Sequence, residues 1–128
     1  MKLWRPVGRN ELAKIEASGM RAFPSRLPEQ PIFYPVLSFE YAEKIARDWN
    51  SVRENNDYAG FVVQFDIDDS YASRFAEQLA GGKDCRELWV PAEELEEFNR
   101  HIRGRIEVVA EYRNGVRTED VHADGAKK

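Results

Sequence analysis

Cysteine and histidine are scarce in this chain, and their scarcity excludes several kinds of site. The 128 residues include one cysteine, Cys85, and two histidines, His101 and His122. A single thiol cannot form a disulfide within the chain, and these three residues are too few for a Cys- or His-rich zinc centre. We therefore expect neither a structural disulfide nor a bound metal.

Long apolar runs and an excess of positive charge are also lacking. No apolar run approaches the ~20 residues that cross a bilayer, and residues 1–6 break off before the apolar core of a signal peptide. Lysine and arginine number 19 against 23 acidic residues, a net charge of −4, so there is no overall basic field to gather nucleic acid. These absences predict a cytoplasmic protein with no membrane partner, and nucleic acid is not an expected partner.

The composition that remains suits one folded domain. Hydrophobic residues make up 42% of the chain and charged residues 33%, which is normal for a globular protein. Strand and helix patterns alternate along it, and this order fits either the α+β or the α/β class. We expect strands at 3–7, 32–37, 60–68, 87–90 and 105–113, and helices at 10–18, 38–49, 69–80 and 91–102.

The C-terminal end has a different character. From Asn114 onward the chain is polar, contains two glycines and shows no periodicity. We therefore expect a single domain over 1–113 and a disordered tail over 114–128. The acidic run at 91–99 is expected to form the solvated face of a helix, where acidic side chains near the N-terminus are favoured.

The segment 20–37 is unusual because it holds four prolines, with Arg21 and Arg26 between them. An ordinary connection needs only about 4–6 residues and no such stiffness. A rigid, exposed loop with two guanidinium groups would make a preorganised lid or phosphate clamp. The alternative is a loop that merely covers the edge of a sheet.

Three segments, in order, resemble blocks of ADP-ribosyltransferase domains. They are "LWRPVGRNELAKIEASGMRAFPSRL" (3–27), "FYPVLSFEYAEKIARDW" (33–49) and "ELWVPAEELEEFNRHIRGRIEVVAEYR" (87–113). The chain also resembles a group of short, uncharacterised bacterial proteins that open Leu-Trp-Arg-Pro-Val-Gly. The resemblance implies the α+β class, with an ADP-ribosyltransferase-like split β-sheet core and short flanking helices.

The resemblance also implies roles for particular residues. Arg5 matches the first-strand arginine that holds the phosphate or ribose of NAD, Tyr34 matches a tyrosine that stacks on nicotinamide, and Glu87 matches the catalytic glutamate that opens the last block. Arg21 and Arg26 would complete the NAD-binding set. A carboxylate beside the ribose would stabilise the positive charge that develops when the nicotinamide–ribose bond breaks. NAD is then the substrate, no metal is needed, and ADP-ribose passes to an unknown acceptor.

Several departures from the family's patterns keep a second interpretation open. The Ser-Thr-Ser motif of the toxin-like branch is absent, and Trp89 stands where that branch has a second glutamate. Arg5 stands where the polymerase-like branch has a histidine. The alternative is a catalytically inactive, partner-binding module of the immunity type on the same scaffold.

Overall fold

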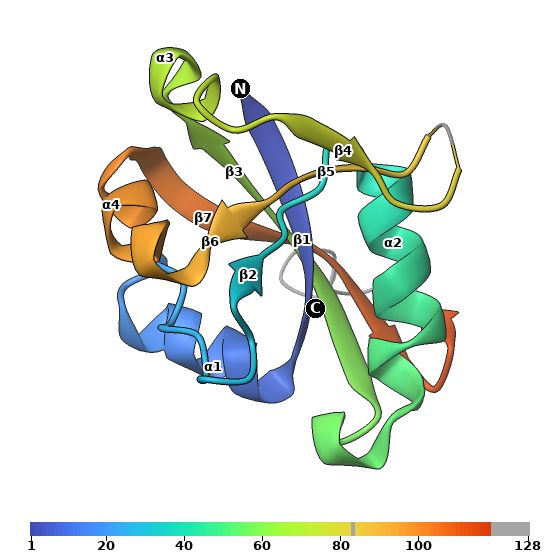
Figure 1. Cartoon of the computed structure of the whole chain (residues 1–128). Helices are drawn as coiled ribbons and strands as arrows, with labels where there is room; N and C mark the ends of the chain where they lie inside the picture. The colour runs from blue at the N-terminus through green and yellow to red at the C-terminus, as the bar shows by residue number, and fades with distance from the viewer. Residues whose placement is uncertain (83, 119–128) are drawn as a thin grey trace.

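Three long antiparallel strands form the main sheet of the protein. The computed structural model describes residues 1–82 and 84–118. Within them the sheet has the order β1-β3-β7-β8, and every pairing in it is antiparallel, so the fold is α+β as predicted (Figure 1). Its strands are β1 (Lys2–Gly8), β3 (Ala59–Ile67), β7 (Ile102–Arg113) and the short β8 (Val116–Arg117).

The sheet continues beyond β1 through one residue of the proline-rich segment. The N–H of Val36 donates to the carbonyl of Trp4 at 2.8 Å, and the N–H of Trp4 donates to the carbonyl of Val36 at 3.0 Å. On the far side of this segment, the N–H of Leu88 in β5 (Arg86–Leu88) donates to Pro35 at 2.9 Å. Val36 therefore joins β1 to β5, and the sheet curls over at this point.

Two further strand pairs complete the curl. Strand β5 pairs with β4 (Glu77–Leu79), and β2 (Ile32–Phe33) pairs with β6 (Val90–Pro91). Both pairs are antiparallel and short. The stretch of chain from β4 to β6 crosses in front of β1, as Figure 1 shows.

Hydrophobic side chains cover both faces of the main sheet because successive residues of a strand point to opposite faces. Phe61, Val63 and Phe65 of β3 belong to the larger core, which also takes in the helices α1 (Arg9–Ala17) and α4 (Leu95–Arg100). The smaller core contains the intervening Val62 and the buried alanines of α2 (Phe39–Asp48).

The remaining helical segments are α3 (Asp69–Ala72), η1 (Asn50–Val52), η2 (Glu54–Asn56) and η3 (Ala92–Glu94).

Helix α2 lies unusually close to the sheet. A Cβ atom added at Gly60 of β3 would lie 2.3 Å from the backbone carbonyl of Ala46, so only glycine permits this approach. At the other end of the helix, the hydroxyl of Ser38 caps the first turn by accepting a hydrogen bond from the N–H of Tyr41 at 3.1 Å. Gly60 and Ser38 together fix where the side chains of α2 point.

The helix predicted over 69–80 is wrong beyond its first turn. Helix α3 ends at Ala72, and residues 77–79 form β4. The glycine pair at 81–82 does not end a helix but lies in the loop between β4 and β5, where the N–H of Ala80 donates to the carbonyl of Cys85 at 2.8 Å. Tyr71, Phe75 and Leu79 have the spacing of four that is typical of a helix. Residues 77–79 nevertheless form a strand, because they pair with β5.

Other boundaries also differ from the prediction. The strand expected over 32–37 is regular only at 32–33, and Pro91 lies in β6 rather than at the start of a helix. Ile102 was expected on a helix but is the first residue of β7, because α4 stops at Arg100. The predicted tail begins too early: Asn114 and Gly115 turn the chain into β8, and the Gly115 N–H donates to the Ser51 hydroxyl at 2.8 Å. Residues 119–128 lie outside the described residues. Among those described, none of the helices has the length and apolar character needed to cross a membrane.

Candidate functional site

One cavity of about 380 Å³ brings together four of the five residues that the sequence singles out. This Glu87 cavity falls in the range of about 300–1,000 Å³ that is usual for small-molecule sites. Arg21 is exposed and is not part of its lining. The wall contains Arg5, Pro6, Arg26, Tyr34, Val36, Ile45, Trp49, Asn50 and Glu87.

The cavity opens at Pro6 because the pairing of β1 with the proline-rich segment is brief. The N–H and carbonyl of Trp4 both point toward Val36. Pro6, two residues further along an antiparallel strand, has the same orientation. Its missing N–H therefore faces the open edge of β1, so no unpaired donor is left there. The sequence thus creates an unpaired edge without an unsatisfied backbone N–H.

Arg5 is anchored on three sides within this wall. Its Nε and Nη2 donate to the two carboxylate oxygens of Glu11 at 2.6 and 3.0 Å, and its Nη1 donates to the carbonyl of Tyr34 at 3.3 Å. The centre of the guanidinium lies 4.6 Å from the centroid of the Phe33 ring, a cation–π distance. Arg5 is only 9% exposed. It therefore ties β1, α1 and the proline-rich segment together and is already paired with a carboxylate.

Arg26 is the second guanidinium of the cavity and is less completely paired. Its centre lies 5.8 Å from the centroid of the Phe33 ring, and its Nε is buried with no hydrogen-bond partner among the described residues. Burial, and next the charge of Arg5, lower the pKa of Arg26. An anion in the cavity would offset both effects, since it would supply an acceptor and an opposite charge.

Glu87 is the acidic residue of the lining and is held at both of its oxygens. The Tyr41 hydroxyl donates to Oε2 at 2.8 Å, and the indole Nε1–H of Trp89 donates to Oε1 at 2.8 Å. Glu87 and Trp89 can meet because residues two apart on a strand point to the same side. Glu87 is 8% exposed. The carboxylate is therefore fixed and sheltered at the wall of the cavity.

Aromatic rings frame the opening of the cavity. Tyr34 and Trp89 meet edge to face, with centroids 5.9 Å apart and an angle of 89° between their planes. Trp49, the residue that follows α2, is also part of the lining, and the guanidinium of Arg53 lies 3.3 Å from the centroid of its ring. Exposed aromatic surfaces beside a charged wall suit a ligand that combines a flat ring with charged groups.

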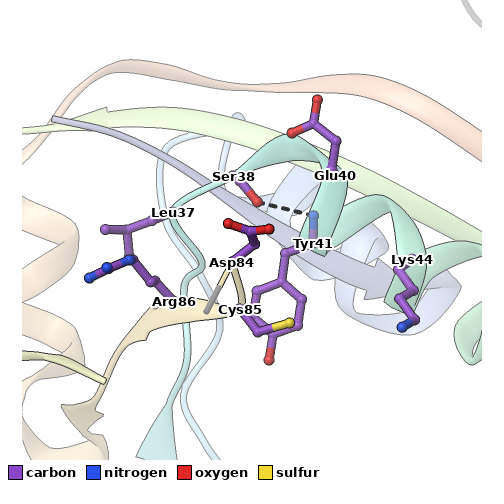
Figure 2. A pocket seen from close by; sticks show the side chains of 8 residues that line it. All are labelled: Leu37, Ser38, Glu40, Tyr41, Lys44, Asp84, Cys85 and Arg86. Carbon is purple, nitrogen blue, oxygen red and sulfur yellow. Dashed lines mark hydrogen bonds between the residues drawn. The ribbon is translucent and has the colours of Figure 1, made fainter. Parts of the chain in front are cut away.

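Tyr41, whose hydroxyl donates to Glu87, lines a second cavity of about 460 Å³, and Figure 2 shows the side chains around it. Burial, and next the hydrogen bond to Glu87, raise the pKa of Tyr41. Glu87 lines the first cavity and Tyr41 the second, so their hydrogen bond links the two. The second cavity is lined by Leu37, Ser38, Glu40, Tyr41, Lys44, Asp84, Cys85 and Arg86.

Sequence reasoning did not find three residues that hold the lining in place. Trp89 could have been found, because it lies two residues after Glu87 on a predicted strand. Glu11 and Tyr41 gave no signal, because their contacts depend on how α1 and α2 pack against the sheet.

Within residues 1–82 and 84–118, no group of three or more His, Cys, Asp or Glu side chains is arranged to hold a metal ion.

Comparisons of the chain with protein-family models, with curated proteins and with solved structures found no match.

Proposed function

We propose that the Glu87 cavity binds the nicotinamide riboside end of NAD and that the protein is an ADP-ribosyltransferase-like enzyme. In this proposal the curled antiparallel sheet is the split sheet of that fold. One observation carries the proposal: Arg5, Arg26, Tyr34 and Glu87 are distant in sequence, yet they line a single cavity. They supply the cation, the aromatic ring and the carboxylate that cleavage of NAD requires.

The chemistry assigns a role to Glu87. The bond from the ribose C1′ to the nicotinamide nitrogen breaks, and its electron pair leaves with nicotinamide, which becomes neutral. Positive charge then develops on the ribose, and the nearby carboxylate stabilises it in a sheltered site. The acceptor's nucleophile bonds to C1′ and gives up its proton to solvent. Tyr34 would hold the flat nicotinamide ring by stacking.

The diphosphate of NAD is assigned to Arg26 rather than to Arg5 alone. Glu11 already occupies two nitrogens of Arg5, whereas the Nε of Arg26 has no partner among the described residues. A guanidinium binds phosphate oxygens through strong, charge-assisted hydrogen bonds. Arg5 would then hold the backbone at Tyr34 and add positive charge to the same wall.

The test is a comparison of Glu87→Gln with Glu96→Gln. We expect calorimetry to show NAD binding to both variants and to the wild type. Release of nicotinamide should fall by roughly 10²–10³ in Glu87→Gln, because the lost charge acts mainly in the transition state. Glu96 is 86% exposed on α4, so its variant should behave as the wild type does. Equal turnover by Glu87→Gln and the wild type would refute the catalytic role of Glu87.

The inactive, partner-binding module remains the second candidate, and one observation favours it. Both oxygens of Glu87 and all three nitrogens of Arg5 already have partners within the protein. A cavity wall whose charged groups are already hydrogen-bonded within the protein would suit a module that binds NAD or a protein without catalysing a reaction. NAD binding with no nicotinamide release by the wild type would support this candidate, and the absence of NAD binding would remove NAD from the proposal altogether.

A further inference from the structure

The side chain of Glu87 lies between two donors that come from different elements. Trp89 belongs to the same extended segment as Glu87, whereas Tyr41 comes from the first turn of α2. The Tyr41 contact therefore depends on the tertiary fold and fixes the carboxylate relative to the helix. Without it, Glu87 would be held only by a neighbour two residues away.

We infer that Tyr41 is a positioning residue for Glu87, holding its carboxylate toward the cavity that contains Arg26 and Tyr34. The role in catalysis rests on the proposed function, while the positioning itself does not. Both oxygens are occupied, so the carboxylate can neither rotate freely nor swing toward solvent. A reacting group must be held close to its productive geometry, and small displacements lower the rate considerably.

The surroundings of Tyr41 suit this role. Its backbone N–H is held by the Ser38 hydroxyl at 3.1 Å, as the dashed line in Figure 2 shows, so the start of the side chain is fixed by the helix cap. Its pKa is raised above the ordinary tyrosine value, first by burial and next by the bond to Glu87, so the phenol is protonated at neutral pH and in mild alkali. A protonated phenol facing a carboxylate donates to it, so the direction of the hydrogen bond is fixed as well.

Two other tyrosines in the chain make the same kind of bond and separate positioning from simple structural support. Tyr71 donates to Glu94 at 2.9 Å, and Tyr112 donates to Glu43 at 2.8 Å. Neither of these glutamates lines the Glu87 cavity. Tyr71→Phe therefore removes a matched Tyr–Glu hydrogen bond away from the site and is the control for Tyr41→Phe.

The first experiment measures NAD cleavage and NAD binding separately. In Tyr41→Phe we expect kcat for nicotinamide release to fall by about 10- to 100-fold, with the Kd for NAD unchanged within about twofold, because only the orientation of Glu87 is affected. Tyr71→Phe should keep both values. Wild-type turnover by Tyr41→Phe would overturn the inference, and so would an equal loss in both variants.

The second experiment does not depend on NAD chemistry. In protein labelled with ¹³C at the glutamate δ carbon, the Glu87 resonance is identified by its absence in Glu87→Gln. We expect Tyr41→Phe to shift this resonance and Tyr71→Phe to leave it in place. If the wild type neither binds nor cleaves NAD, the proposed function fails and this spectrum alone decides the positioning. An unmoved Glu87 resonance in Tyr41→Phe would overturn the inference.

Discussion

At the scale of single residues, the cavity is defined by an uneven pairing of charges. Two guanidinium groups approach the same ring, that of Phe33, and within residues 1–82 and 84–118 only that of Arg5 has a carboxylate partner at short range. Arg5 is paired with Glu11, while burial and next the charge of Arg5 lower the pKa of Arg26. A cation in this position attracts an anionic ligand.

Replacing Arg26 with Gln should therefore weaken NAD binding by about 10- to 100-fold, since a hydrogen bond to a charged group contributes ~1.5–3 kcal/mol. Arg21→Gln removes the same charge from the same loop but outside the cavity, and it should leave the affinity unchanged. Isothermal titration calorimetry at constant salt compares the two. Equal losses would indicate a general effect of net charge rather than a contact with Arg26.

The sequence could point to Arg5, Arg26, Tyr34 and Glu87 because each stands out in a short, ordered pattern. It could not show that Arg26 lies in the cavity while Arg21 stays outside, since the two differ only in how the loop turns. The partner of Arg5 could not be named either, because the reach of Glu11 from α1 to β1 follows from tertiary packing.

At the scale of elements, helix α2 contributes lining residues to both cavities. Its amphipathic spacing predicts it clearly, and its cap at Ser38 is confirmed. Helix α3 and strand β4 could not be separated from sequence, because short apolar segments fit either period and long-range pairing decides between them. The glycines at 81–82 stop a helix or turn a hairpin equally well.

The cap of α2 provides a test at this scale. Ser38→Ala should lower the free energy of unfolding by about 1 kcal/mol, because the Tyr41 N–H loses its acceptor. Ser38→Asp keeps an acceptor at the same place and should retain most of the stability. Urea denaturation followed by circular dichroism measures both. An alanine variant as stable as the wild type would mean that the cap contributes nothing.

At the scale of the whole molecule, three tyrosines hydrogen-bonded to glutamates contribute to the response to alkali. Burial, and next a bond to a glutamate, raise the pKa of Tyr41 and Tyr112, and the same causes raise the pKa of Tyr71 from 10.0 to about 12. Below pH 10 the phenols are protonated in both states, and their contribution to stability is fully present. Above pH 10 the unfolded chain releases these protons first, so the folded state loses stability.

We therefore expect the free energy of unfolding to fall as the pH rises from about 10 to about 12, the interval set by Tyr71. Urea titrations at a series of pH values measure the slope. Tyr71→Phe should reduce that slope, because one phenol no longer titrates. A slope unchanged by this substitution would show that Tyr71 ionises equally easily in both states.

The pairing of β1 with β3 has a consequence for how the protein acquires its cavity. Residues 2–8 meet residues 60–66, so about half of the chain must be in place before this ladder can close. Hairpins such as β4–β5 and β7–β8 involve neighbouring residues and can form early, whereas such distant pairing is slow. Arg5 lies on β1 and Glu87 lies on β5, so the cavity needs β1 to be in its final place. The cavity is therefore among the last features to form during folding, and fragments without β1 have no cavity of this kind.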